Sequence, residues 1–125
     1  LEQCGATVID ERRDERTGGQ RVEWQLARAE LVVDCTPTGL DAAADAAFAA
    51  ALPLDALPAG ALVATLVYHR RTALLERAAA RGHPTLDGRA MLVHQAARAI
   101  AIWTGREPPV DIMTRALDAA LVKSA

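Results

Sequence analysis

Short apolar runs typical of β-strands alternate along this chain with helical patterns, and this order constrains the fold more than any other feature. It predicts a parallel sheet whose strands are joined by crossover helices. Gly18-Gly19 is expected to form a turn between the first two runs. The predicted fold class is therefore α/β. The expected strands are Ala6–Ile9, Arg21–Trp24, Leu31–Val33 and Ala61–Val67.

Capping residues indicate where the predicted helices begin and end. Thr72 can cap a helix that ends before Gly82, and Asp87 can cap the longest helix of the chain. The last helix begins at Pro109, a residue that favours the first helical turn. The expected helices are Asp41–Leu52, Ala73–Arg81, Gly88–Trp103 and a final one from Pro109 onward.

Composition and charge exclude several classes of protein. The chain has 125 residues, 51% of them hydrophobic, enough for a single core that buries about two-thirds of the unfolded surface. The net charge is −2, and the arginines of residues 10–16 alternate with acids, which argues against nucleic acid as a partner. No apolar stretch approaches the roughly 18 residues that would span a membrane.

The cysteine content favours a reducing cytoplasm. Cys4 and Cys35 are too few for a disulfide scaffold. The sequence starts at Leu1, and no charged segment followed by an apolar core indicates a secretory signal. We therefore expect a cytoplasmic protein, and a chain that is part of something longer.

The sequence offers few residues suited to catalysis or metal binding. Its one lysine, Lys123, and one serine, Ser124, lie in a tail that is expected to fray. The three histidines have no metal-ligand spacing, so no metal site is expected. A dinucleotide-binding fold needs a glycine-rich turn between its first strand and first helix, and nothing before Cys4 can provide one.

One polar residue, Gln95, occupies the middle of an apolar stripe on the longest predicted helix. An unpaired buried amide would cost about 1–3 kcal/mol, so the amide needs a partner. Spacing alone leaves two possibilities open, a neighbouring backbone carbonyl or a ligand. The stripe repeats at helical spacing and consists of Met91, Leu92, Gln95, Ala96, Ala99, Ile102 and Trp103.

Several motifs occur together in this part of the chain. Asp87-Gly88 is followed by Met91-Leu92 and Gln95-Ala96-Ala97, then by Trp103-Thr104-Gly105 and Pro109-Val110. Upstream lie Thr36-Pro37-Thr38-Gly39, Tyr68 and Thr72 followed by Leu74-Leu75. In this order and spacing the motifs closely resemble the C-terminal end of shikimate dehydrogenases. The resemblance covers Ala29 to about Leu117.

The resemblance implies an enzyme of chorismate and aromatic amino acid biosynthesis that reduces 3-dehydroshikimate with NADPH. It also implies that the catalytic lysine and aspartate belong to an N-terminal substrate domain that this chain does not contain. Residues 1–86 would form a partial Rossmann-like cofactor domain without its first strand and glycine-rich loop. Residues 87–125 would be helices that pack on the substrate domain.

The resemblance carries over to particular residues. Tyr68 and Gln95 match the positions that contact the substrate, and Thr36, Leu66 and Gly88 match positions beside the cofactor. No catalytic residue is expected in this chain.

The sequence departs from the family at positions that affect cofactor choice. Asp34-Cys35 stands where the family usually has Asn-Ala. Where NADP-dependent members carry an arginine that faces the 2′-phosphate, this chain has Asp10-Glu11 followed by Arg12-Arg13. An acid suits the free ribose of NAD, whereas Arg12 could meet the phosphate of NADP. NADP is the expected cofactor, and NAD remains possible.

Interpretations from two different classes, an enzyme and a non-catalytic module, follow. The first is the C-terminal part of a shikimate dehydrogenase, an enzyme acting on a small molecule. The alternatives are a non-catalytic truncated or degenerate nucleotide-binding module, or an NAD-dependent quinate/shikimate dehydrogenase. The terminal helices are expected to meet either the missing substrate domain or a second copy of the chain.

Overall fold

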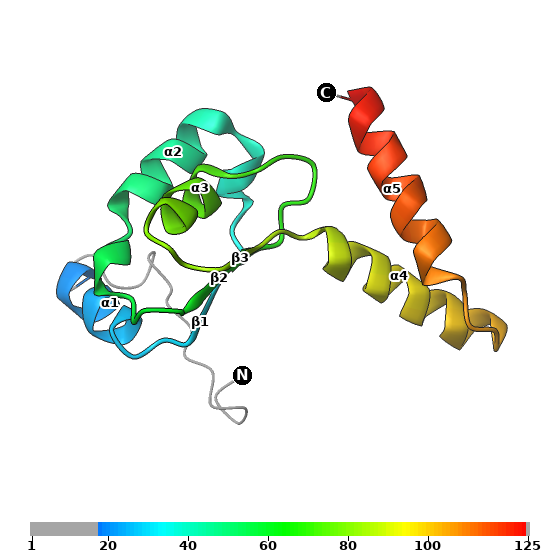
Figure 1. The fold of residues 1–125 in the computed structure, drawn as a ribbon, viewed down its shortest axis with the longest axis horizontal. Coiled ribbons are helices and arrows are strands. Elements are labelled where there is room, and N and C mark those ends of the chain that lie inside the picture. The colour runs from blue at the N-terminus through cyan, green and yellow to red at the C-terminus, as the bar shows by residue number, and fades with distance from the viewer. Residues whose placement is uncertain (1–17, 125) are drawn as a thin grey trace.

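The computed structural model describes residues 18–124, which form a small parallel sheet with helices packed on it and a separate helix pair (Figure 1). The three strands lie in the order β1-β2-β3 and all pair in parallel. The predicted α/β class is confirmed. In chain order the elements are α1 (Gly18–Leu26), β1 (Leu31–Asp34), η3 (Pro37–Leu40), α2 (Ala42–Ala51), η4 (Leu54–Ala56), β2 (Leu62–Thr65), α3 (Ala73–Ala80), β3 (Thr85–Leu86), α4 (Arg89–Thr104) and α5 (Val110–Ser124).

The core lies between one face of the sheet and the helices that cover it. Val63, at the centre of the sheet, is fully buried and pairs in register with Val32. Helices α2 and α3 lie side by side over this face (Figure 1). The other buried members of the core are Leu26, Ala49, Leu54, Leu57, Ala61, Leu74, Leu75 and Ala78.

The opposite face of the sheet is apolar and largely uncovered. Because side chains alternate across a strand, Leu31 and Val33 point away from the core, and they are 54% and 44% exposed. Leu86 on β3, in line with Val33 across the sheet, is 49% exposed. Within the described residues, β1 is also an edge strand with one unpaired side.

Local signals explain the helices over the core. Asp41 caps α2, its carboxylate accepting the N–H of Ala44 at 2.8 Å. Thr72 caps α3 as expected, and Gly82 follows it with a φ of +82°, a conformation that favours glycine.

Helices α4 and α5 pack on each other and project away from the sheet (Figure 1). Helix α4 ends at Gly105, which is left-handed with a φ of +67°. Asp111 and Arg115 form an ion pair on α5 at 3.0 Å. The residue that caps α4 is Gly88 rather than the expected Asp87, whose carboxylate instead accepts the N–H of Arg89 at 3.1 Å.

The strand expected at Arg21–Trp24 is wrong, and so is the turn expected at Gly18-Gly19. Both segments lie in helix α1. Val22 and Leu26 are one helical turn apart and turn inward, whereas Trp24 is 58% exposed and lies under the guanidinium of Arg28. The four residues Arg21–Trp24 have only two apolar positions, and this pattern fits the spacing of a strand as well as that of a helix. The burial of Leu26, one turn after Val22, distinguishes the helix from the strand. The strand expected at Ala6–Ile9 lies outside the described residues.

No helix within residues 18–124 is both long enough and apolar enough to cross a membrane.

Candidate functional site

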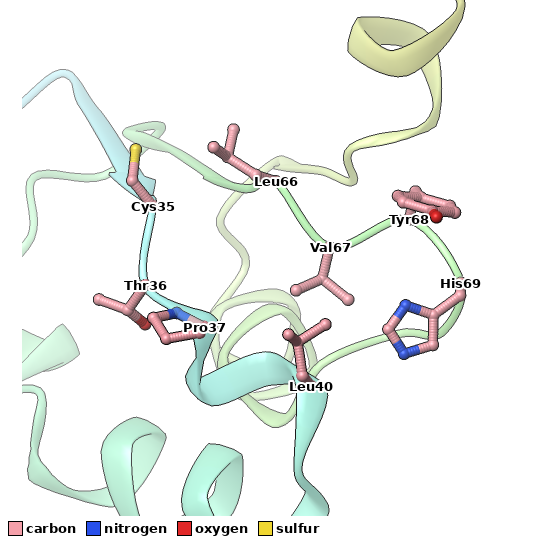
Figure 2. Close-up of a pocket in the computed structure, with 8 residues that line it drawn as sticks. All are labelled: Cys35, Thr36, Pro37, Leu40, Leu66, Val67, Tyr68 and His69. Carbon is pink, nitrogen blue, oxygen red and sulfur yellow. The ribbon is translucent and has the colours of Figure 1, made fainter.

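The loops that follow β1 and β2 form the two walls of a hollow at the carboxyl ends of these strands (Figure 2). Ligands of open parallel sheets commonly bind at this edge. The hollow measures about 230 Å³, below the roughly 300–1,000 Å³ of sites that enclose a whole ligand. It can therefore hold one end of a larger molecule. Its lining residues are Cys35, Thr36, Pro37, Leu40, Leu66, Val67, Tyr68 and His69.

The first wall is held by a buried carboxylate at the end of β1. Asp34, 5% exposed, accepts both the N–H of Thr36 at 2.8 Å and its hydroxyl at 2.7 Å. Because the Thr36 hydroxyl proton goes to Asp34, the hydroxyl of Thr38 donates to Thr36 in turn. In Figure 2 the Thr36 side chain points away from Leu66 and Tyr68, which lie on the other side of the hollow. Asp34 therefore shapes this loop.

The second wall presents half-exposed side chains. Leu66 and Tyr68 are 37% and 38% exposed, and the Tyr68 ring meets the ring of His69 edge-on at 5.8 Å. Val67 between them is buried and points toward Leu40 of the first wall (Figure 2).

The two walls touch at a glycine. A Cβ added to Gly39 would lie 2.6 Å from Cγ2 of Val67 and 3.1 Å from Cγ2 of Thr72. Only a residue without a side chain lets η3 approach the second wall this closely.

A second glycine joins the hollow to helix α4. The N–H of Gly88 donates to the Val67 carbonyl at 3.0 Å, and Nε of Arg89 donates to the Tyr68 carbonyl at 3.2 Å. A Cβ on Gly88 would lie 2.1 Å from the carbonyl oxygen of Leu66. The backbone that carries Leu66 and Tyr68 is therefore in direct contact with the start of α4.

Three of the residues predicted for the site thus line one hollow, namely Thr36, Leu66 and Tyr68, and Gly88 lies against its second wall. Gln95 does not line it. The expectation that Gln95 is buried is wrong for this chain, because α4 leaves the sheet and turns Val93 and Ala97 inward instead. Gln95 is exposed and has no need of a partner to offset burial. Arg12 lies outside the described residues.

The chemistry of the hollow is that of a binding surface. Its lining contains no carboxylate, lysine or arginine, and four of its eight residues are aliphatic or proline. Such a surface suits a flat, largely apolar group with a few polar atoms at its edge. Within residues 18–124 there is no cluster of three His, Cys, Asp or Glu side chains that could hold a metal ion.

Sequence reasoning missed several residues of the site. Pro37 belongs to the Thr36-Pro37-Thr38-Gly39 motif, and Cys35 and Val67 are neighbours of motif residues, so all three could have been included by position alone. His69 and Leu40 belong to no motif, and neither does Arg70, whose Nε donates to the Gly39 carbonyl at 2.9 Å. They become visible only when the loops are brought together.

Comparison with known proteins identifies relatives of this chain. The family model for the shikimate 5′-dehydrogenase C-terminal domain matches residues 88–117. A protein of Thermosynechococcus vestitus named shikimate dehydrogenase (NADP(+)) is 39% identical over 94% of this chain and 47% of its own length. One of Afipia carboxidovorans with the same name is 46% identical over 77% of this chain and 34% of its own length. The chain spans a third to a half of the length of these relatives.

Solved structures give the same result. The shikimate 5-dehydrogenase of Thermus thermophilus, determined in complex with shikimate, matches 79% of this chain and 36% of its own, with a TM-score of 0.61 and 30% identity. The shikimate dehydrogenase of Mycobacterium tuberculosis matches 80% of this chain and 35% of its own, with a TM-score of 0.61 and 28% identity.

Proposed function

This chain belongs to the shikimate dehydrogenase family, whose C-terminal portion it matches, and on that basis we propose that it is the C-terminal part of an NADP-dependent shikimate dehydrogenase. The reaction proposed is the reversible reduction of 3-dehydroshikimate to shikimate, a step of chorismate and aromatic amino acid biosynthesis. The observation that carries the proposal is the hollow, whose two walls come from the same loops as the motifs that match the family.

The uncovered surfaces support the assignment to part of a larger enzyme. One face of the sheet exposes Leu31, Val33 and Leu86, and β1 has an unpaired edge within the described residues. The proposed division is a partial cofactor domain in residues 1–86 and, in residues 87–125, helices that pack on the substrate domain. The proposed packing of these helices on the substrate domain is supported by the exposed apolar residues of α4 and α5, which include Ile102, Trp103 and Ile112.

The hollow fits only one end of NADP. Its aliphatic lining suits the nicotinamide ring, and the absence of lysine and arginine from it argues against a phosphate there. We assign Thr36, Leu66 and Gly88 to the cofactor side. Arg12 is proposed to meet the 2′-phosphate, a choice that would favour NADP over NAD. The catalytic groups are proposed to lie on the substrate domain.

The mechanism proposed for this chain is one of positioning. Thr36, Leu66 and Gly88 would hold the nicotinamide end of NADP⁺, which would supply the acceptor for the hydride of shikimate. Leu66 and the backbone beside it form an apolar wall that orients the ring and keeps water from that side. Tyr68, at the rim, is proposed to donate its hydroxyl to the carboxylate of shikimate, and the Gln95 amide is proposed to bind the substrate from α4. Orientation of this kind lowers a barrier without acid–base catalysis by the residues assigned here.

The proposed location is the cytoplasm. The exposed free thiol of Cys35 supports it, because a thiol in contact with solvent persists best where the environment is reducing.

The test is to express the complete open reading frame that encodes this chain and to measure shikimate oxidation with NADP⁺ and with NAD⁺. Gln95→Ala is expected to weaken shikimate binding by about 1–3 kcal/mol with cofactor affinity unchanged. An equal loss of cofactor affinity would contradict the substrate role of Gln95.

The chain by itself is expected to show no shikimate-dependent reduction of either cofactor, because proton transfer at the substrate hydroxyl needs a positioned acid–base group. Saturable turnover by the purified chain would overturn the placement of the catalytic groups elsewhere. An inactive complete protein that still binds nucleotide would favour a degenerate binding module.

A further inference from the structure

Arg70 joins the two walls of the hollow. It follows Tyr68 and His69 in the second wall, and its guanidinium reaches back to the end of the first wall. Nε donates to the carbonyl of Gly39 at 2.9 Å, and Nη2 donates to the carbonyl of Asp41 at 3.4 Å. Two carbonyls some thirty residues earlier in the chain therefore share one side chain.

A buried carboxylate holds the guanidinium in place. Nη2 of Arg70 lies 3.0 Å from Oδ2 of Asp45, whose side chain is 2% exposed, compared with 30% for that of Arg70. The same Oδ2 accepts the N–H of Ala73 at 2.7 Å, at the start of α3. Asp45 thus ties α2 both to Arg70 and to the first residue of α3.

These contacts act on both walls of the hollow. Gly39 lies two residues after Pro37 and directly before Leu40, both of which line the first wall. Arg70 directly follows His69, which lines the second. A planar guanidinium with several fixed donors can hold two carbonyls and a carboxylate in one geometry, which an ammonium group cannot.

We propose that Arg70, anchored by Asp45, is a positioning residue that sets the separation of the two walls of the hollow and so the fit of the ligand between Leu40 and Tyr68. The inference rests on the proposed function for the identity of that ligand. Arg70 itself is not a catalytic residue, since it acts through the loops it holds. The neighbouring Arg71 offers a contrast, because it is exposed and makes one 3.3 Å hydrogen bond to Thr85.

The experiment compares four variants of the complete protein: Arg70→Ala, Arg70→Lys, Asp45→Asn and Arg71→Ala. Steady-state kinetics would be measured with shikimate and NADP⁺, and amide hydrogen exchange would be followed in parallel. Exchange is read at the N–H groups of Asp41 and Val67, which bond to Thr38 and to Thr65 within the two walls.

Arg70→Ala is expected to raise the KM for shikimate about tenfold while kcat changes less than about twofold, because small misplacements of a binding wall are costly. Exchange at Asp41 and Val67 should accelerate, while exchange in β2 and α3 stays slow. Arg70→Lys should raise the KM less than Arg70→Ala does, because lysine keeps a positive charge beside Asp45 but cannot hold the second carbonyl. Asp45→Asn should resemble Arg70→Lys, and Arg71→Ala should match the unaltered protein.

Two outcomes would overturn the proposal. In one, Arg70→Ala behaves like Arg71→Ala in both KM and exchange. In the other, Arg70→Ala accelerates exchange throughout the sheet and lowers kcat and affinity together, as expected for a purely structural residue. If Arg70→Ala does not fold, Arg70→Lys still decides between these results. Should the unaltered protein not oxidise shikimate, the proposed function fails, while local exchange at Asp41 and Val67 still tests the positioning role.

Discussion

Gly88 lies directly against the carbonyl of Leu66. A Cβ at Gly88 would be 2.1 Å from the carbonyl oxygen and 2.5 Å from the carbonyl carbon. Both neighbouring atoms belong to the backbone and cannot rotate away as a side chain could. The direction in which α4 leaves the sheet is therefore fixed by a contact between two backbones.

Replacing Gly88 by alanine is expected to loosen this junction. The added methyl must push α4 away from Leu66, with a cost of at least about 2 kcal/mol in the free energy of unfolding. Urea denaturation measures the cost, and limited proteolysis should show faster cleavage near Arg89. Gly82→Ala is the control, because its Cβ would meet nothing within 4 Å and only the positive φ of +82° would be strained, at about 1–2 kcal/mol. Equal proteolysis of the two variants would contradict the steric explanation.

Replacing Asp45 by alanine is expected to lower the free energy of unfolding by about 3 kcal/mol. The change leaves the Ala73 N–H without its acceptor and the Arg70 guanidinium without its counter-charge. Urea denaturation is again the measurement. Asp111→Ala breaks an ion pair whose side chains are about 70% exposed and should cost less than about 0.5 kcal/mol. A similar effect for the two substitutions would show that burial of Asp45 adds nothing.

Asp55 is expected to titrate below the ordinary aspartate value. Hydrogen bonds from Arg81, at 2.6 and 3.3 Å, and the charge of that guanidinium hold the pKa of Asp55 below 3.8. A lowered pKa in the folded state means that the pair contributes its stability above the unfolded value and loses it as the pH falls through the folded value. A carbon-detected NMR titration should give the depressed pKa, and Arg81→Gln should return it toward 3.8. An unchanged pKa in that variant would rule out Arg81 as the cause.

The chain alone is expected to self-associate through its terminal helices. Ile102 and Trp103 on α4 are 66% and 80% exposed, and Val122 on α5 is 79% exposed. Exposed apolar surface of this kind usually marks an interface. Sedimentation velocity at tens of micromolar should show association that Trp103→Ser weakens. Trp24→Ser, at the other tryptophan of the chain, is the control, and an equally compact monomer for all three proteins would contradict the prediction.

The sequence predicted those elements whose signals are local. The apolar runs at β1 and β2, and the caps Thr72 and Gly82, lie within a few residues of the elements that they define, and these elements appear close to where they were expected. The two-residue strand β3 was missed because Thr85-Leu86 has no period of its own and is a strand only by pairing with β2. Helix α1 was missed because the four residues Arg21–Trp24 are too few to distinguish helical spacing from the alternation of a strand.

The site was predicted in part through the family resemblance, which supplied Thr36, Leu66 and Tyr68. The three residues meet because parallel strands bring the residues that follow them to one edge of the sheet. The environment of Gln95 depends on what covers α4, which no local pattern specifies. The contact of Arg70 with Asp45 joins residues 25 positions apart and arises only from the packing of helix α2 against the loop after β2. The one sequence feature that could have indicated this contact is Asp45, a single acidic residue among the alanines of α2.

That lone acid has a consequence for how α2 settles on its neighbours. Eight of the ten residues of α2 are alanine and Phe48, packed on the core, is its one large apolar side chain, so apolar packing distinguishes only weakly between rotations about the helix axis. Only one of them brings a carboxylate to both the Ala73 N–H and the Arg70 guanidinium, because any other rotation would leave Asp45 buried without a partner. A single polar contact thus selects one setting of a nearly featureless helix.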